Sequence, residues 1–339
     1  MKEIKTKDAV GHVISHDITQ IIPGKIKDVL FKKGHVVREE DIEALMKVGK
    51  MNLYVFENDG TVIHENEAAS MLADIVAPDD MARSAVKEGK IEISAPVSGV
   101  LRVNKEKLNA LNSFDDIMVA TRHDYTPVKK GDKLAGTRII PLVIKNDVMA
   151  EAQALRGDAP ILELKPYVHK KAAIVTTGSE VFEGLIEDGF TPVVQKKLLS
   201  YDAEEIGHVT VPDDPKQATD AIKMLIERGA DIVFVTGGMS VDPDDKTPLA
   251  IKNTGAEIIS YGAPVLPGAM FMVSYLNGIP VLGLPGCVMH APTTILDLVL
   301  PRIMADIPVT KQDIINLGAG GFCLQCEKCN YPVCGFGAQ

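Results

Sequence analysis

Three glycine-containing turns carry the residues of this sequence whose types and spacing could do chemistry. They read TTGSE at 176–180, TGGMSVDPDD at 236–245 and GLPGC at 283–287, and each follows an apolar run. Glycine permits positive φ and close approach of a ligand to the backbone. N–H groups exposed in such a turn, before a helix, attract anions. The carboxylates in the same turns cannot bind that anion, so a phosphate with a bridging divalent metal, Mg²⁺, fits the pattern.

A plainer interpretation stays open for each turn taken alone. Glycine is common between a strand and a helix for steric reasons, and an aspartate near a helix start caps the helix or favours its dipole. The middle turn carries Asp242, Asp244 and Asp245, of which the first two could be turn formers. Three such turns at one edge of one sheet favour a phosphate-bearing ligand over the plainer interpretation.

Several common site motifs are absent from the sequence. It contains no G-x-x-x-x-G-K-[ST] phosphate loop and no G-x-G-x-x-G after a first strand. The stretch GMSVD has Asp242 where a nucleophile elbow requires its last glycine. Among the eight histidines, His290 comes shortly after one of the glycine turns and is the one placed to meet a ligand, whereas His208 has the character of a structural residue.

The last residues contain a second candidate site. CLQCEKCNYPVC has the spacing C-x₂-C-x₂-C-x₄-C, and four thiolates so close in sequence can surround one centre. The first three resemble a ferredoxin cluster run, although that run continues with x₃-C-P, whereas zinc sites more often use two separated pairs. Zinc, an iron–sulfur cluster and a flexible redox tail all remain open for these residues: Cys323, Cys326, Cys329 and Cys334.

Composition limits the class of protein. The chain has 339 residues, 46% hydrophobic and 24% charged, which is typical of a globular protein with more than one domain. A net charge of −10 disfavours a nucleic-acid partner. The sequence shows no secretory signal and no window long enough to span a membrane. We therefore expect a cytoplasmic protein, in which a cysteine cluster indicates metal or redox chemistry.

Four regions are expected along the chain. Residues 1–60 form a small mixed α/β segment with a strand at 11–18. Residues 61–165 form a β-rich middle domain with a leading helix, because short β-type pieces alternate with turn residues. Residues 166–310 form an α/β domain, and residues 311–339 form a linker and the cysteine-rich tail.

The third region predicts a doubly wound parallel sheet. Its strands are apolar on both faces and alternate with helices, as in sheets covered on both sides. Pro215 is expected at the first turn of one helix, and Thr247 as the N-cap of another with Pro248 behind it. Ligands of such folds bind at the carboxyl ends of the strands, which is where the glycine turns fall.

About 140 residues of this third region resemble the molybdopterin-binding domain of molybdenum-cofactor biosynthesis enzymes, the molybdopterin molybdenumtransferases and the gephyrin E domain. The resemblance is carried by TTGSE, GLIEDG, TGGMSVDPDD, VLPGAMF and GLPGC, in the family's order and spacing. It implies an α/β fold, a pterin-phosphate ligand, and a Mg²⁺-dependent transferase that inserts molybdate into adenylylated molybdopterin and releases AMP. It also implies a homodimer and a molybdoenzyme partner.

The resemblance assigns roles to individual residues. Asp245 matches the family's catalytic acid and magnesium ligand, Glu180 the acid of its T-G-x-E motif, and Asp188 that of the following segment. The implied cofactor-binding residues lie in the glycine turns and in PGAM: Thr177, Gly178, Ser179, Thr236, Gly237, Gly238, Ser240, Pro267, Gly268, Pro285 and Gly286.

Three departures from the family pattern raise an alternative. Ser179 stands where the family usually has Asp, PGAM at 267–270 stands where it has P-G-K-P, and PGCV stands where it has P-G-N-P. Loss of a lysine and an aspartate weakens anion and metal binding. The alternative is a non-catalytic carrier or sensor of finished molybdenum cofactor, with a metal-binding cysteine tail. Separately, Cys287 of the last turn is either packed or faces the molybdenum. A phosphosugar or nucleotide enzyme on a similar fold is a third hypothesis.

Overall fold

The computed structural model describes residues 2–22, 26–55, 60–243 and 245–338, which divide into two compact units. The first unit comprises Met1–Pro96, Val103–Arg122 and Gly131–Glu163, and the second comprises Val97–Arg102, His123–Lys130 and Leu164–Gln339. In the part of the chain that is described, no helix has both the length and the apolar character needed to cross a lipid bilayer.

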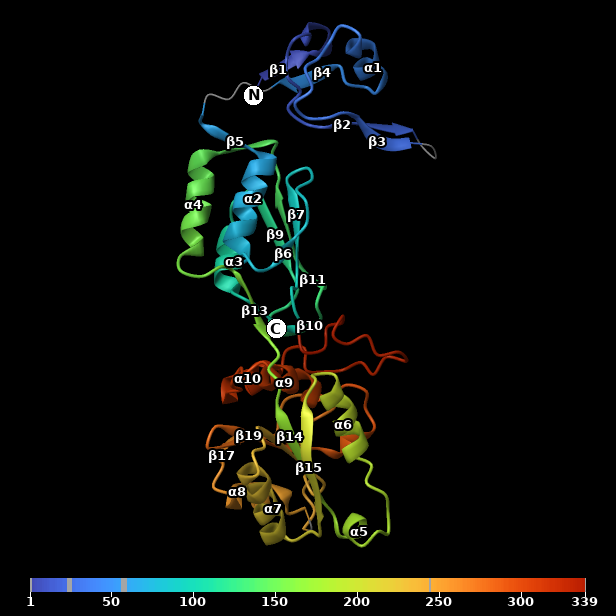
Figure 1. Ribbon diagram of the computed structural model, residues 1–339, viewed down its shortest axis with the longest axis vertical. Helices are drawn as coiled ribbons and strands as arrows, with labels where there is room; N and C mark the ends of the chain where they lie inside the picture. The colour runs from blue at the N-terminus through green and yellow to red at the C-terminus, as the bar shows by residue number, and fades with distance from the viewer. Residues whose placement is uncertain (1, 23–25, 56–59, 244, 339) are drawn as a thin grey trace. The chain divides into compact units, whose positions relative to one another are not determined.

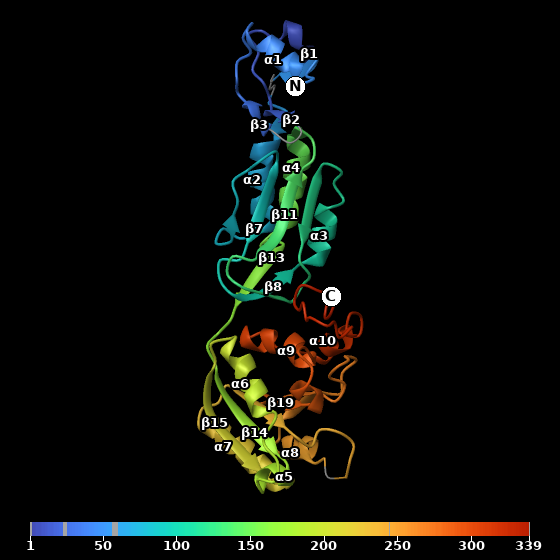
Figure 2. The ribbon, with the colours of Figure 1, turned by 90° about the vertical axis from the view of Figure 1, so that its right-hand side faces the viewer.

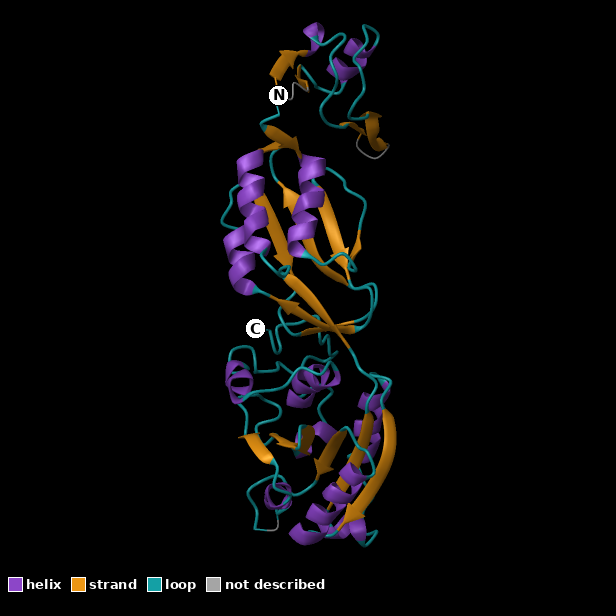
Figure 3. Ribbon diagram, turned by 60° about the vertical axis from the view of Figure 1, so that its left-hand side comes forward, coloured by secondary structure: helices purple, strands orange, loops and turns teal. Residues whose placement is uncertain are grey.

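The first unit is built from short antiparallel pairs and a four-stranded sheet. The sheet has the order β6-β7-β11-β9, and helices α2 and α3 cover one of its faces while α4 packs on α2 (Figure 3). The elements of this unit are β1 (Lys2–Lys5), η1 (Thr6–Asp8), β2 (Ile18–Ile22), β3 (Ile26–Phe31), α1 (Asp41–Lys47), β4 (Asn52–Val55), β5 (Val62–His64), α2 (Glu65–Val76), β6 (Ala82–Arg83), β7 (Lys90–Ser94), α3 (Lys105–Leu111), β9 (Ile117–Thr121), β11 (Lys133–Ile139), β12 (Val143–Lys145) and α4 (Asn146–Arg156).

The expected leading helix is present as α2, and the two further helices α3 and α4 were not predicted. The strand expected at 11–18 is wrong. Val13 and Ile14 make only isolated bridges, and the regular strand β2 begins at Ile18. Ile14 and Ile18 are fully buried in a small hydrophobic core. Packing in this core, and not the pairing of a regular strand, explains why the stretch is apolar.

The second unit contains the expected α/β sheet (Figures 1 and 2). Its order is β15-β14-β16-β19-β18-β17, in which β15, β14, β16 and β19 run parallel while β18 and β17 complete the sheet antiparallel. The elements are β14 (Lys171–Thr177), α5 (Ser179–Phe182), α6 (Thr191–Leu199), β15 (Glu204–Val211), α7 (Pro215–Glu227), β16 (Ile232–Thr236), α8 (Thr247–Asn253), β17 (Glu257–Tyr261), β18 (Met272–Leu276), β19 (Ile279–Leu284), η2 (Gly286–Met289), α9 (Ile295–Met304) and α10 (Lys311–Asn316).

A smaller, three-stranded sheet is formed by segments near the points where the chain passes from one unit to the other. It has the order β10-β8-β13, from β10 (Thr126–Val128), β8 (Gly99–Val103) and β13 (Leu162–Pro166).

Alternate residues of the central strands are buried on opposite faces of the large sheet. Ala172 and Ile174 of β14 belong to the core under α6 and α9, whereas Ala173 and Val175 belong to the core under α7 and α8. This two-sided burial explains why the strands are continuously apolar in sequence. The prediction of a doubly wound, mostly parallel sheet is therefore confirmed, with an antiparallel edge that was not foreseen.

Helix α9 anchors the core under the sheet, and a capping box begins it. Nine of its ten residues are buried. Thr294 accepts a hydrogen bond from the Leu296 N–H at 3.2 Å, and Asp297 Oδ2 accepts one from the Thr294 N–H at 2.8 Å. The helix end inside the core is thus satisfied by its own side chains.

We expect Thr294→Ala to lower the free energy of unfolding by about 1–2 kcal/mol, because a buried N–H of the first turn then loses its acceptor. The measurement is the urea midpoint followed by circular dichroism. Thr310→Ala is the matched control, since Thr310 forms the same box at exposed helix α10. Equal losses in the two variants would contradict a special role for the buried cap.

Candidate functional site

The three glycine turns lie at one edge of the large sheet. Thr176, Thr236 and Leu284 are paired across β14, β16 and β19, so the turns that follow these strands meet at the same edge. From β14 the chain continues to β15 on one side and later returns to β16 on the other. Such a reversal of strand order opens a crevice at the strand ends, where open α/β sheets bind ligands.

The turn after β16 passes very close to the end of β14. Gly237 and Gly238 have φ of 84° and 50°. A Cβ on Gly237 would lie 2.1 Å from the Thr177 carbonyl oxygen, so only glycine fits. Within the described part of the chain, the N–H groups of Gly238, Met239 and Ser240 donate no hydrogen bond. Three unused donors in one turn can receive an anion.

Threonine hydroxyls fasten the strand ends beneath this turn. Thr177 Oγ1 donates to the Thr236 carbonyl at 3.1 Å and lies 2.9 Å from Thr247 Oγ1. All three threonines are buried. Thr177 and Thr236 were expected as cofactor ligands. The Thr177 hydroxyl and the Thr236 carbonyl instead bond to each other and position the turn. Thr247 is not an N-cap as expected: Lys246 holds that position, and the Thr247 hydroxyl is directed to Thr177.

Asp245 closes the same turn and is half-buried. Its Oδ2 accepts a hydrogen bond from the Asp242 N–H at 3.1 Å, and its N–H donates to the Asp242 carbonyl at 2.9 Å. The Tyr261 hydroxyl donates to the Met239 carbonyl at 3.0 Å, which holds the turn from β17. Burial, and then the Asp245 charge, raise the pKa of Tyr261, so its hydroxyl stays a donor. Asp244 lies outside the described residues.

The turn after β14 is closed by an acid that sequence reasoning missed. The Ser179 N–H donates to Asp213 Oδ2 at 2.9 Å, and the Asp213 N–H donates to Ser179 Oγ at 3.2 Å. Asp213 lies two residues beyond the end of β15, and its position after a strand at the same edge was the available signal. Glu180 is exposed, and its carboxylate bends toward Gly178. Ser179 is thus committed to Asp213, whereas Glu180 is accessible to a ligand.

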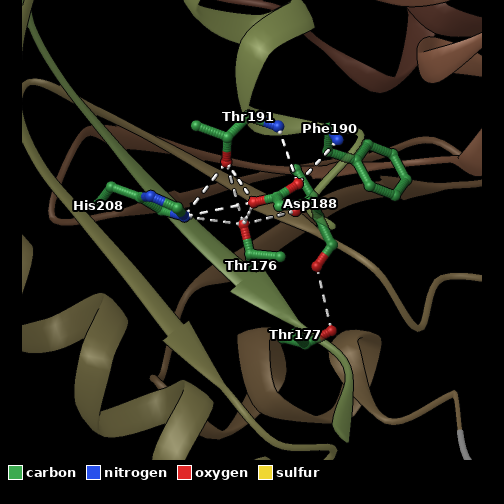
Figure 4. A network of polar contacts seen from close by, with 7 residues as sticks. Thr176, Thr177, Asp188, Phe190, Thr191 and His208 are labelled. Atoms are coloured by element: carbon green, nitrogen blue, oxygen red, sulfur yellow. Dashed lines mark hydrogen bonds and ion pairs between the residues drawn. The ribbon is translucent and has the colours of Figure 1, made fainter. Parts of the chain in front are cut away.

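Asp188, the third expected acid, is enclosed in a polar network (Figure 4). Its Oδ1 accepts hydrogen bonds from the N–H groups of Phe190 and Thr191, at 2.8 and 3.1 Å. Its Oδ2 accepts from the hydroxyls of Thr191 and Thr176, at 2.6 and 2.8 Å, and lies 3.5 Å from His208 Nε2. The network joins β14, β15 and the start of α6, which makes Asp188 a structural acid with both oxygens engaged.

Two opposing effects act on the pKa of Asp188. Burial is the largest single effect and raises it, but the hydrogen bonds from Thr191, Thr176 and Phe190 together outweigh burial and hold the pKa below its ordinary value. The carboxylate is therefore stabilised in its charged form. His208, expected to be structural, is part of the same network.

A shallow depression beside the turn after β16 is lined in part by a lysine, Lys246. Its lining includes Thr177, Asp213, Lys246 and Thr247. The Lys246 ammonium group has no ion-pair or hydrogen-bond partner among the described residues, and Lys246 was not singled out from the sequence. A lysine in this place can supply the positive charge that PGAM lacks.

The remaining predicted ligands divide between two places. Pro285 and Gly286 follow β19 at the sheet edge, and Gly286 is exposed. Gly268 packs on Ile295 of α9, and Pro267 lines a cavity shared with the C-terminal tail. Pro267 and Gly268 therefore contact α9 and the tail.

Cys287 lies in the third turn and His290 lies just after it, and the two side chains differ in exposure. His290 is exposed at the end of η2. Burial raises the pKa of the Cys287 thiol, which favours a protonated, packed cysteine over a thiolate ligand.

The expected metal ligands of the tail are reduced cysteines. Cys323 is half-buried, while Cys326, Cys329 and Cys334 are exposed. Over residues 2–22, 26–55, 60–243 and 245–338, no three His, Cys, Asp or Glu side chains are grouped closely enough to hold a single metal ion.

Comparison with known proteins gives two domain matches. Residues 173–305 match the family described as "probable molybdopterin binding domain", and residues 3–57 match a domain of unknown function. The chain is 35% identical over 91 residues to a CinA-like protein from Thermosipho melanesiensis, covering 26% of this chain and 22% of that protein. It is 29% identical over 131 residues to a molybdopterin molybdenumtransferase from Staphylococcus aureus, covering 37% and 31%.

These matches span less than a third of each curated relative. Among solved structures, the molybdopterin biosynthesis enzyme MoaB from Thermus thermophilus is 20% identical, with a TM-score of 0.32, and the alignment covers 39% of this chain and 91% of that one.

The Asp188 network yields a prediction on stability. Asp188→Asn should lower the free energy of unfolding at neutral pH by about 1–3 kcal/mol, because part-buried hydrogen bonds to a charged acceptor are weakened or lost. Since the pKa of Asp188 is lowered by folding, this stabilisation is complete above the unfolded pKa, about 3.9, and disappears as pH falls through the folded pKa.

Urea unfolding of wild type and variant from neutral to acid pH measures this difference. Asp220→Asn, which removes an exposed pair with Lys216, is the control and should change stability by about 0.5 kcal/mol or less. A gap between wild type and Asp188→Asn that stays constant down to the lowest pH would be the contrary result.

Proposed function

We propose that the chain uses the edge of β14, β16 and β19, within the part that matches the molybdopterin-binding family at residues 173–305, to bind molybdopterin and to insert molybdate into its adenylylated form. One observation carries the proposal. The turn after β16 holds three N–H groups without an acceptor in the described residues, together with the carboxylate of Asp245. An anion and a cation can thus be held by one turn.

The turn is rigid enough to recognise a phosphate. The Met239 side chain is buried, and its methyl group lies so close to Gly283 of β19 that a Cβ there would be 2.6 Å away. Tyr261 holds the turn from its other side. In the proposal, the N–H groups of Gly238, Met239 and Ser240 bind the terminal phosphate of the pterin, and Lys246 adds positive charge. Preorganised donors lose little entropy when the anion binds.

Magnesium fits these residues only if the substrate supplies most of its ligands. Asp245 is one carboxylate, and Mg²⁺ commonly combines one or two carboxylates with phosphate oxygens and water. When bound, the ion would neutralise charge on the phosphates as AMP leaves. Asp245 holds its carboxylate at the turn through the Asp242 N–H, Glu180 faces the ligand from the neighbouring strand end, and Asp188 positions the start of α6.

A non-catalytic carrier of the finished cofactor is the second candidate. The specific observation in its favour is that Ser179, in place of the family's aspartate, is bonded to Asp213, and that both oxygens of Asp188 are engaged. Asp245 and Glu180 are then the expected acids left to act on a ligand. The homodimer and a molybdoenzyme partner stay predictions for either candidate.

The decisive experiment mixes the full chain with adenylylated molybdopterin, molybdate and Mg²⁺ and measures release of AMP. Release that depends on molybdate and on the protein supports insertion. Co-purifying pterin, identified by mass spectrometry, without AMP release supports the carrier. Absence of both binding and release overturns the proposed function.

Asp245→Ala should reduce AMP release at least about 100-fold, because an electrostatic contact to the reacting phosphates is lost. Asp242→Ala is the matched control in the same turn: only backbone groups of Asp242 make the contacts described above. It should retain release within a few-fold. Equal loss in both variants would indicate that the turn has collapsed, not that a carboxylate acts.

Lys246→Ala should weaken binding of the pterin phosphate about 10–100-fold, which is the value of a hydrogen bond to a charged group. Lys252→Ala serves as the control, because Lys252 is exposed in the last turn of the same helix. Equilibrium binding in low and moderate salt measures both. Unchanged affinity in Lys246→Ala would remove this lysine from the proposed site.

A further inference from the structure

The C-terminal tail packs against the α/β part of the second unit, to which it belongs. Figure 1 shows it beside α9 and α10. The Cys323 N–H donates to the Leu266 carbonyl at 2.8 Å, and the Leu266 N–H donates to the Gly321 carbonyl at 2.8 Å. Phe336 is buried in the core under α9, and a Cβ on Gly337 would lie 2.3 Å from Leu298. The cysteine segment is thus attached at both of its ends.

All four tail cysteines line one cavity of about 270 Å³, far larger than the ~10–15 Å³ that one water requires. Pro267 and Thr293 form its wall on the α/β side, and Phe322 and Leu324 contribute apolar surface. Thr293 Oγ1 lies 3.0 Å from Cys329 Sγ. Four reduced thiols around one cavity form a complete set of soft metal ligands.

The arrangement distinguishes between kinds of centre. A single zinc ion with Zn–S bonds of about 2.3 Å draws four sulfurs to within roughly 4 Å of one another. Among the described residues, no three metal-ligating side chains are grouped in that way, although all four cysteines line the same cavity. A cavity of about 270 Å³, lined by four cysteines that are not gathered at one point, has room for a centre of several atoms.

We propose that Cys323, Cys326, Cys329 and Cys334 bind a [4Fe–4S] cluster in this cavity. Each cysteine gives up its thiol proton as its sulfur binds one iron, and three of the ligands follow the C-x₂-C-x₂-C spacing of ferredoxin runs. The Thr293 hydroxyl lies in place to donate to the Cys329 sulfur, and Phe322 and Leu324 place apolar surface beside the cluster. This centre is separate from the proposed pterin function and does not depend on it.

The test uses the full chain without oxygen, incubated with ferric iron, sulfide and dithiothreitol, which reduces part of the iron. After removal of excess reagents, iron and acid-labile sulfide should each be about four per chain, with broad visible absorption. Cys326→Ala and Cys334→Ala should lose most of both. Circular dichroism checks that these variants, changed at exposed positions, remain folded.

Cys287→Ala is the matched control, because Cys287 is not among the cavity-lining residues, and it should load as wild type does. A parallel incubation uses zinc alone. Iron and sulfide at background, whether zinc is retained or not, would overturn the cluster. So would two iron and two sulfide per chain, or equal loading of folded Cys326→Ala and wild type.

Discussion

The close approach of two strand ends is the constraint on which the candidate site depends. The backbone at Gly237 passes so near the Thr177 carbonyl that no side chain fits between them. Buried hydroxyls of Thr177 and Thr247 hold this approach from below. Gly237 and Gly238 both have positive φ. Among the described residues, the N–H groups of Gly238, Met239 and Ser240 then have no acceptor, and such a turn can receive an anion.

The acids at this edge divide into those that hold the structure and those that remain accessible. Asp188 accepts four hydrogen bonds and joins β14 to α6, so its charge is used within the protein. Asp213 closes the turn after β14 through Ser179. Asp245 and Glu180 keep enough exposure to meet a ligand. A carboxylate that is fully satisfied would lose several hydrogen bonds on binding a metal, whereas an accessible one exchanges mainly water.

The segment after β19 connects the two candidate centres of the second unit. Gly286 lies at the sheet edge, and a few residues later Thr293 forms part of the cavity wall and approaches Cys329. If a ligand at either place moves this segment, its effect on the affinity at the other place must be reciprocal. The segment between the two places consists of one short turn and the N-terminal cap of α9. Thr294 is buried and forms this cap together with Asp297.

Local chemistry explains which features were predictable from sequence. Continuous apolar strands, Pro215 at a helix start and the acid of the TGG turn are each encoded within a few residues, and the sheet could be expected from them. The roles of Tyr261 and Lys246 arise only when distant segments meet at one edge, which no local pattern records, whereas Asp213 could have been noticed because it comes shortly after strand β15. At Thr247 a distant contact overrides a local pattern. Its residue type favours an N-cap, yet its hydroxyl lies against Thr177, because a buried hydrogen-bond partner outcompetes a local one. Asp188 matched a catalytic motif, yet four donors from β14 and α6 surround it, so residue type identified the acid while tertiary structure decided what it could do.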